Sequence, residues 1–197
     1  MPGSSSRGVR AVLFATSNAG KLKEARTILA PFGISVKQYD GKGTEIQADT
    51  NSDVAAYASR GAAKAARRPV LVEDAGLYVD SLDGFPGPYS AYAFKTIGVA
   101  GILSLLRRSH SGRAARFVSS LAYCTPRGEP TLFEGSVRGL LTAKRRGTRG
   151  FGFDPIFVPD GGAKTFGELT LEEKCSISHR ADAMKKFAKW YLSRDKR

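Results

Sequence analysis

The chain has 197 residues, of which 42% are hydrophobic, and a formal net charge of +13. This length fits one domain, or one domain in two lobes, and the hydrophobic content is sufficient for a core. No apolar run approaches the roughly 18 residues that suggest a membrane span, so we expect no membrane partner. The basic charge attracts polyanions, but no zinc-finger or RNP-type motif accompanies it, so we expect no specific nucleic-acid partner.

The N-terminal residues and the two cysteines indicate the compartment. The first ten residues, MPGSSSRGVR, lack the apolar segment of a secretory signal. We expect residues 1–8 to form a flexible tail and residues 9–197 to form a single two-lobed domain. Cys124 and Cys175 form no metal-ligand pattern, so we interpret both as packing residues of a reduced, cytoplasmic protein.

The first predicted unit is a strand, a turn and a helix. Residues 10–16 have the composition of a buried strand, and the turn that follows is rich in small and polar residues. Residues 21–30 have apolar positions at helical spacing. The first N–H groups of such a helix favour an anion, and its lysine, Lys21, could reach a phosphate oxygen. The alternative is an ordinary turn in which Ser17 or Asn18 caps the helix.

A second strand and a second helix are predicted next. Residues 34–39 form the strand, and residues 53–68 form an alanine-rich helix with Ser52 or Asp53 as its cap. The polar segment between them carries one isolated acid, Glu45.

Two adjacent acids follow the next predicted strand. Residues 69–72 read as a buried strand, Glu73 and Asp74 come directly after it, and residues 77–79 form a second strand-like run. Side-chain alternation in a strand sends the two carboxylates to opposite sides. One could therefore face a cleft and a divalent metal while the other braces it. A solvated strand end is the alternative.

The second half of the chain indicates a mixed sheet. Residues 81–88 are dense in Gly and Pro and form a shaped loop, and residues 89–106 form a helix broken at 98–101. Residues 114–123 and 131–141 are predicted to be a long antiparallel pair. Because strands and helices do not alternate strictly, we expect an α/β fold whose sheet is mixed.

Aromatic and basic residues gather in the last third. Phe151 and Phe153 lie in a Gly-rich segment that could stack a base, or both rings could plug the core. A strand is predicted at 156–158 and a short amphipathic segment at 165–176. A helix at 177–192 follows Ser176. His179 and Arg180 lie in its first turn, where cations oppose the helix dipole, so a functional or ion-paired role is expected for them.

Four segments resemble the inosine/xanthosine triphosphate pyrophosphatases, which remove non-canonical purine nucleotides. They are TSNAGK (16–21), VEDAGLYVDSLDGFPGPYS (72–90), GFGFDPIF (150–157) and EEKCSISHR (172–180). The resemblance covers nearly the whole chain, in order. It implies a two-lobed α/β fold with a long central mixed sheet flanked by helices, an active-site cleft between the lobes, and a homodimer. It also implies Mg²⁺-dependent cleavage of ITP, dITP or XTP to the monophosphate and pyrophosphate.

The same resemblance assigns roles to individual residues. Asp74 would accept the proton of the attacking water, Glu73 would support it, and Glu45 and Asp74 would hold Mg²⁺. A donor such as Arg180 would favour the 6-keto group of hypoxanthine and xanthine. The substrate-binding residues implied are Thr16, Ser17, Asn18, Lys21, Ala75, Phe151, Gly152, Phe153, Asp154, Lys174, His179 and Arg180.

Two departures and two alternatives remain. Phe153 stands where the family often has Trp or Tyr, and either Arg60 or Lys64 could match a lysine that many members carry on the helix before the central strand. A related pyrophosphatase with another base preference, such as a modified pyrimidine, is one alternative. A basic RNA- or nucleotide-binding module is the other, but it leaves Glu45 and the two central acids unexplained.

Overall fold

The computed structural model describes residues 10–41, 46–108 and 112–194. The predicted tail (1–8) and Glu45 lie outside these residues. A seven-stranded sheet runs through the molecule in the order β2-β1-β3-β5-β6-β7, and β4 pairs with β3. The strands are β1 (Arg10–Ala15), β2 (Ile34–Tyr39), β3 (Val70–Val79), β4 (Pro86–Gly87), β5 (Ala114–Cys124), β6 (Thr131–Leu141) and β7 (Phe157–Pro159).

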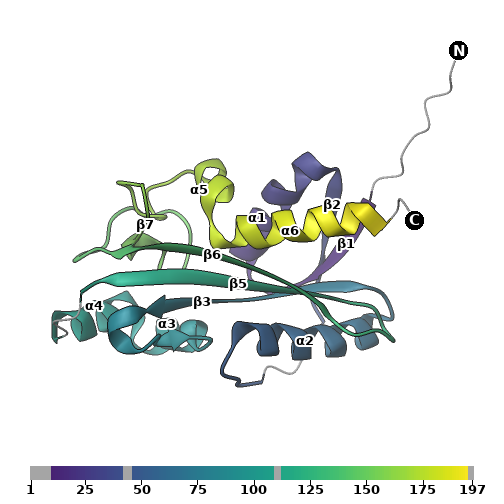
Figure 1. Ribbon diagram of the computed structural model, residues 1–197, viewed down its shortest axis with the longest axis horizontal. Coiled ribbons are helices and arrows are strands. Elements are labelled where there is room, and N and C mark those ends of the chain that lie inside the picture. Colours follow the sequence, from purple (N-terminus) through teal and green to yellow (C-terminus); the bar gives the residue numbers. More distant parts are fainter. Residues whose placement is uncertain (1–9, 42–45, 109–111, 195–197) are drawn as a thin grey trace, which may run out of the picture.

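The sheet is mixed, as predicted. β1 pairs in parallel with both β2 and β3, whereas the pairings of β3 with β4 and β5, and of β6 with β5 and β7, are antiparallel. Its helices are α1 (Ala19–Leu29), α2 (Asn51–Ala66), α3 (Ser90–Thr96), α4 (Gly98–Arg108), α5 (Leu171–Ile177) and α6 (His179–Ser193). Figure 1 shows α6 and α2 on opposite sides of the long strands.

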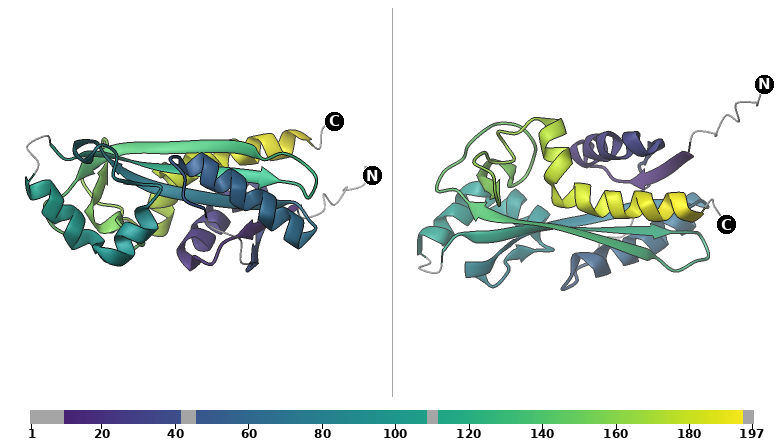
Figure 2. Two further views of the ribbon diagram at one scale, coloured as in Figure 1. Left: turned by 90° about the horizontal axis from the view of Figure 1, so that it is seen from below. Right: turned by 45° about the horizontal axis from the view of Figure 1, so that its top comes forward.

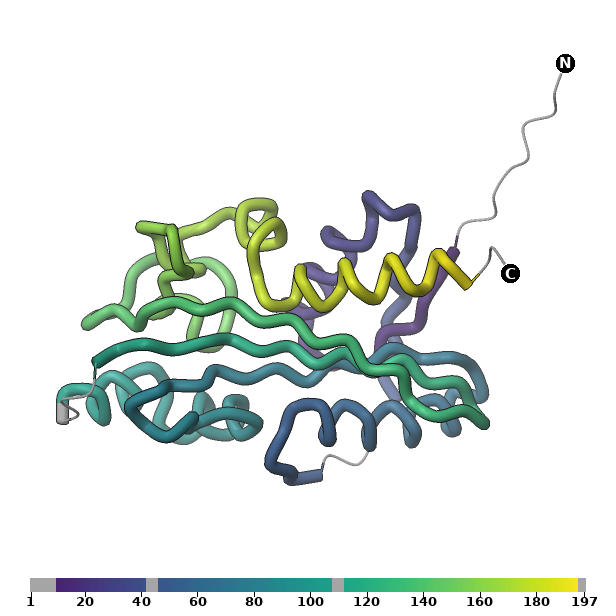
Figure 3. Tube along the Cα trace, in the orientation of Figure 1, coloured from purple at the N-terminus to yellow at the C-terminus, as the bar shows by residue number. Residues whose placement is uncertain are grey.

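The molecule has two halves joined by the long strands. β5 and β6 run along its whole length, with β1, β2, α1 and α2 around one half and α3, α4 and β7 around the other (Figures 2 and 3). Separate hydrophobic clusters fill the two halves: one contains Phe14, Leu71 and Met184, and another contains Leu77 and Ile102. The two-lobed α/β architecture is therefore confirmed.

Several predicted boundaries are wrong by a few residues. α2 begins at Asn51 and is capped by Thr50, whose hydroxyl accepts from the Asp53 N–H. α6 begins at His179 and is capped by Ser178 instead of following Ser176. The predicted strand at 156–158 begins one residue later, because a short 3₁₀ helix takes up Asp154–Ile156.

The largest difference concerns the central strand. The two runs predicted at 69–72 and 77–79 are one strand, β3, whose ten residues stay in register with β5. Both cysteines are free and buried, as predicted. No helix among the residues that the structure describes is long and apolar enough to cross a membrane.

Candidate active site

The candidate site lies where one edge of β3 has no neighbouring strand. β1 pairs with β3 as far as Val72, and β4 begins to pair with it at Leu77. Among the strands that the structure describes, residues 73–76 therefore pair on one side only, with β5. The first turn of α1 approaches this open edge: Lys21 Nζ donates to the Glu73 carbonyl oxygen at 3.2 Å.

The turn after β1 is well ordered by its own side chains. Asn18 Oδ1 accepts from the Lys21 N–H at 3.0 Å and caps α1, and Thr16 Oγ1 accepts from the Asn18 N–H at 3.1 Å. Ser17 and Asn18 are exposed. The cap that was predicted as an alternative is thus present. It also places the positive end of α1 beside Lys21, an arrangement suited to an anion.

Glu73 is held on the side of the sheet that faces α1 and α6. Ser119 Oγ donates to its carboxylate at 2.5 Å, Arg180 Nε donates at 2.9 Å, and Lys21 Nζ lies 3.7 Å away. Burial alone would raise the pKa of Glu73, but the charges of Arg180 and Lys21 with the hydrogen bonds outweigh it and lower this pKa to about 2. Glu73 is therefore buried and ionised, and it holds Arg180 and Lys21 by charge and hydrogen bonding.

Glu24 is a member of this cluster that the sequence analysis missed. It is 2% exposed, and its carboxylate accepts from Lys174 Nζ at 2.8 Å and from Arg180 Nη1. Burial would raise its pKa, but the two cations lower it overall. The available signal was its place on α1, four residues before Ile28 and so on the face that packs into the core. Two residues expected to bind substrate are thus joined by one carboxylate.

Asp74 lies on the opposite side of the sheet, as side-chain alternation predicts. Its Oδ2 accepts from Asn51 Nδ2 at 2.6 Å, and Tyr78 Oη donates to Asn51 Oδ1 at 2.5 Å. Burial raises the pKa of Asp74, and this effect exceeds the opposing effects of Lys21 and Asn51. Asn51 was also missed, since an Asn at the start of a helix ordinarily indicates only a cap.

Phe151 connects the turn after β1 with the buried cations. Lys174 Nζ lies 4.8 Å from the centroid of its ring, and the Arg180 guanidinium carbon lies 5.4 Å from it. A Cβ atom on Gly20 would come within 2.5 Å of the Phe151 ring, so glycine permits the contact. The ring is half-buried. The predicted phosphate turn and the predicted base-stacking ring are therefore neighbours.

Asp154 organises the loop that carries Phe151. Its Oδ2 accepts from the Phe151 N–H at 2.8 Å and from Lys174 Nζ at 2.5 Å. Burial raises the pKa of Asp154 despite the charge of Lys174. Gly150 permits this arrangement, because a Cβ atom there would meet the same carboxylate oxygen at 2.1 Å, and both Gly150 and Gly152 have positive φ.

Phe153 and His179 are placed deeper than Phe151. Phe153 is 3% exposed in the core of the second half, with its ring edge against Phe94 at 5.4 Å. His179 stacks on Phe117 at 4.7 Å, and burial together with the nearby cations lowers its pKa well below the ordinary value. Each of the two predicted alternatives therefore holds for one ring: Phe153 packs in the core, whereas Phe151 lies beside the candidate site.

Asp74 has the chemistry of a Mg²⁺ ligand in a site that substrate completes. Among the residues that the structure describes, no group of three or more His, Cys, Asp or Glu side chains could hold a metal. Asp74 is half-buried and lies beside the open edge of β3. Mg²⁺ is commonly bound through one or two carboxylates with substrate phosphates and water. Asp74 fits this pattern, while the predicted second ligand, Glu45, lies outside the described residues.

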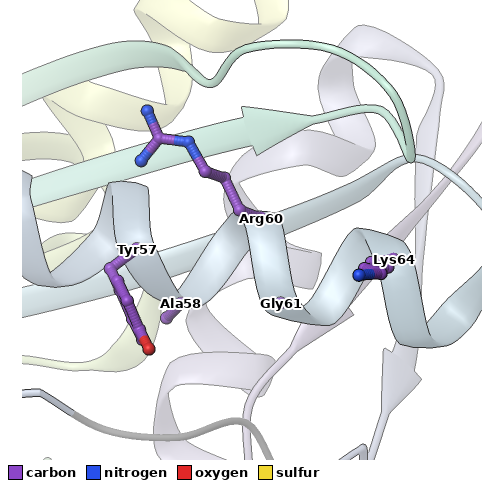
Figure 4. A pocket seen from close by; sticks show the side chains of 5 residues that line it. All are labelled: Tyr57, Ala58, Arg60, Gly61 and Lys64. Atoms are coloured by element: carbon purple, nitrogen blue, oxygen red, sulfur yellow. The ribbon is translucent and has the colours of Figure 1, made fainter.

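A hollow of about 270 Å³ on α2 lies apart from this site. Tyr57, Ala58, Arg60, Gly61 and Lys64 line it (Figure 4). Arg60 pairs with Glu129 at 2.7 Å, and the two side chains are 52% and 83% exposed. Neither Arg60 nor Lys64 has a contact with Asp74 that would select it as the helix lysine, so that choice stays open.

Comparison with known proteins places the chain in a family. The model of the Ham1 family matches residues 12–190. The dITP/XTP pyrophosphatase of Methanopyrus kandleri is 51% identical over 180 residues, covering 91% of this chain and 95% of the relative. That of Thermococcus kodakarensis is 48% identical over 177 residues, covering 90% and 95%.

Solved structures agree with this assignment. A Ham1 protein from Coxiella burnetii has a TM-score of 0.83 at 27% identity, covering 93% of this chain and 99% of its own. The Ham1 protein of Staphylococcus aureus has a TM-score of 0.80 at 30% identity, covering 94% and 100%. With both halves of the fold matched, the chain belongs to the Ham1 family of nucleoside-triphosphate pyrophosphatases.

Proposed function

We propose that the protein hydrolyses non-canonical purine nucleoside triphosphates, namely ITP, dITP and XTP, to the monophosphate and pyrophosphate, and so removes them from the nucleotide pool. The observation that carries this proposal is the convergence of three segments at one place. The capped turn with Lys21, the open edge of β3 with Asp74, and Phe151 above two buried cations are adjacent. They suit phosphate, reacting water and base, respectively.

The reaction needs a base for water and neutralisation of the phosphates. The oxygen of water bonds to the α phosphorus, the bond from that phosphorus to the α–β bridging oxygen breaks, and pyrophosphate leaves with the bonding electrons. Asp74 accepts a proton from the water, and Lys21 with the start of α1 binds phosphate oxygens. Glu45 and Asp74 would hold Mg²⁺, which neutralises phosphate charge and makes bound water more acidic. Glu73 keeps Lys21 and Arg180 in place.

Selection of the base depends on the N–H donors of Arg180 and Lys174 that the ion pairs do not use. A guanidinium has five N–H donors and an ammonium has three. Arg180 uses donors for Glu73 and Glu24, and Lys174 uses donors for Glu24 and Asp154. Each retains capacity for the 6-keto oxygen of hypoxanthine or xanthine, whereas the 6-amino group of adenine offers no acceptor and would leave a donor unpaired.

The decisive experiment identifies the products over a panel of substrates. Purified protein with Mg²⁺ is given ITP, XTP, dITP, GTP and ATP at equal concentration, and pyrophosphate and orthophosphate are measured separately. We expect pyrophosphate from the first three, and little from ATP. Release of orthophosphate alone, or a preference for ATP, would contradict the proposal.

A variant of the central acid tests the mechanism. Asp74→Asn should lower turnover by about 10²–10⁴-fold, the contribution typical of a general base, while nucleotide affinity stays close to that of the wild type. Full turnover in this variant would remove Asp74 from the reaction.

The assembly belongs to the same proposal. The resemblance to the family supports a homodimer that acts in the cytoplasm. Light scattering on the eluting peak of a sizing column distinguishes one copy of the 21.1 kDa chain from two. A mass near 21 kDa at all concentrations would contradict the dimer.

A further inference from the structure

Asn51 and Tyr78 form a chain of hydrogen bonds that ends on Asp74. Asn51 Nδ2 donates to Asp74 Oδ2 at 2.6 Å, and Tyr78 Oη donates to Asn51 Oδ1 at 2.5 Å. Asn51 is 2% exposed, although it is the first residue of α2. Its helix is already capped by Thr50, so the amide of Asn51 is not needed for capping.

The orientation of the Asn51 amide follows from its two partners. An ionised carboxylate only accepts hydrogen bonds, so the NH₂ group must face Asp74 and the amide oxygen must face away. Tyr78 Oη can donate to that oxygen, which fixes the amide against a flip. The reverse orientation would place two acceptors, the amide oxygen and the carboxylate, against each other.

The surrounding residues hold this chain in place. The Asn51 amide packs closely against Gly76, where a Cβ atom would lie 3.3 Å from Asn51 Nδ2 and 2.2 Å from the Gly87 carbonyl oxygen. The Arg116 guanidinium carbon lies 4.9 Å from the centroid of the Tyr78 ring. Arg116 in turn pairs with Asp80 at 3.5 Å. Arg116 therefore packs against the Tyr78 ring from the side of Asp80.

We propose that Asn51 and Tyr78 are positioning residues for the reaction: Asn51 fixes the rotation of the Asp74 carboxylate, and Tyr78 fixes the Asn51 amide. One carboxylate oxygen of Asp74 is thereby committed to Asn51, and the carboxylate is aimed at the open edge of β3. The inference rests on the proposed role of Asp74. It adds two residues that do not touch the reacting atoms: Asn51 lies outside the four motif segments, and Tyr78 lies within the central one, 72–90.

The first test separates turnover from binding. Asn51→Leu removes the donor at nearly constant volume, and Tyr78→Phe removes only the hydroxyl. Partners that orient a ligand residue commonly affect activity by about 10–100-fold, and we expect a loss of kcat of this order in Asn51→Leu and a smaller loss in Tyr78→Phe. KM for ITP, and the calorimetric affinity for a non-hydrolysable α,β-imido analogue, should change by no more than about twofold, because Asn51 orients Asp74 without removing its carboxylate or touching the nucleotide.

A matched control and a double variant exclude a merely structural effect. Thr50→Ala removes the cap of the same helix, so it should lower the thermal midpoint and leave kcat unchanged. If Asn51 acts through Asp74, adding Asn51→Leu to Asp74→Asn should lower the residual kcat no further. An unchanged kcat in Asn51→Leu would overturn the inference, as would an equal loss of kcat in both backgrounds. If Asn51→Leu does not fold, an undiminished kcat in Tyr78→Phe overturns it.

A second measurement requires neither substrate nor metal. The side-chain amide signal of Asn51 in a ¹⁵N-labelled sample is identified by its loss in Asn51→Leu. It should shift in both Asp74→Ala and Tyr78→Phe, and an unmoved signal in either variant would overturn the inference. A wild type that releases no pyrophosphate from any triphosphate would contradict the proposed function, and the amide signal would then decide whether the geometry itself is right.

Discussion

At the scale of single residues, the buried ions beneath Phe151 dominate the candidate site. Three carboxylates (Glu24, Glu73 and Asp154) face three cations (Lys21, Lys174 and Arg180). Taking such charges out of water is expensive, so the complete cluster contributes little net stability, but removing one partner leaves another charge uncompensated. The cluster therefore fixes the positions of these side chains. Its energetic effect should appear as a loss in the free energy of unfolding when one partner is removed.

Replacing Arg180 tests this effect. The guanidinium is 1% exposed and pairs with both Glu24 and Glu73. Arg180→Leu should lower the free energy of unfolding by about 3–5 kcal/mol, the usual cost of breaking a buried pair. Urea unfolding measures the change. Arg60→Leu is the control, because it breaks only an exposed pair with Glu129 and should cost less than about 1 kcal/mol. Equal losses in the two variants would show that the buried cluster is not special.

The low pKa of Glu73 predicts how stability depends on pH. This pKa is about 2 in the folded protein against 4.5 for an ordinary glutamate. Since the folded value is depressed, the stabilisation is fully present above pH 4.5 and is lost as the pH falls from there towards 2. At 1.36 kcal/mol per unit, protonating Glu73 should lower the free energy of unfolding by about 3 kcal/mol relative to neutral pH.

Glu73→Gln supplies the comparison for this pH dependence. The free energy of unfolding is measured in urea from neutral pH down to the acid range for both proteins. The wild type should show the steeper fall below pH 4.5, because the variant has no carboxylate to protonate at this position. Parallel curves would show that Glu73 does not carry the depressed pKa.

At the scale of elements, β3 is the part of the fold on which the site depends. Its ten residues pair with β5 throughout, while the opposite edge is shared between β1 and β4 with a gap at residues 73–76. Gly76 lies at the end of this gap, where the strand passes close to the Gly87 carbonyl oxygen. The lack of a side chain is what allows β3 to continue beside β4.

Two glycine-to-alanine variants measure this requirement. In Gly76→Ala the new Cβ atom would lie 2.2 Å from the Gly87 carbonyl oxygen, so β4 must move, and we expect a loss of about 1–3 kcal/mol. Gly61 lies within α2 with nothing within 4 Å of its Cβ position. Gly61→Ala should therefore raise stability by about 0.5–1 kcal/mol, since alanine favours a helix. The signs of the two shifts in urea midpoint are the measurement, and a stabilised Gly76→Ala would contradict the close approach.

Local sequence patterns predicted most strands and helices well, but they did not predict which side chains contact one another in the site. Strand β2 and the β5–β6 pair were predicted nearly to the residue, because apolar periodicity and turn residues are local signals. The interruption predicted between the runs 69–72 and 77–79 was wrong, since pairing with β5 overrides local composition. Glu24 and Asn51 were missed because their partners lie 150 and 23 positions away, and no local pattern encodes such contacts.

At the scale of the whole molecule, two features bear on the site: the long strands that join the two halves, and the net positive charge. The long strands carry residues from distant parts of the chain to one place, as the contact between Arg180 and Glu24, 156 positions apart, shows. The chain also has 31 Lys and Arg against 18 Asp and Glu. Within the site the charges nearly cancel, so the excess lies mainly elsewhere and produces a long-range positive field.

This field predicts a dependence of substrate capture on salt. A triphosphate carries several negative charges, and attraction over distances beyond the Debye length of about 10 Å at 0.1 M salt is screened as salt rises. Between about 0.05 and 0.5 M NaCl, with Mg²⁺ held in excess, KM for ITP should rise roughly tenfold while kcat stays within about twofold, because the buried pairs are screened much less. Sucrose at equal osmolality is the control and should leave KM unchanged. A KM that does not respond to salt, or a kcat that falls in parallel, would show that the positive surface does not draw in the nucleotide.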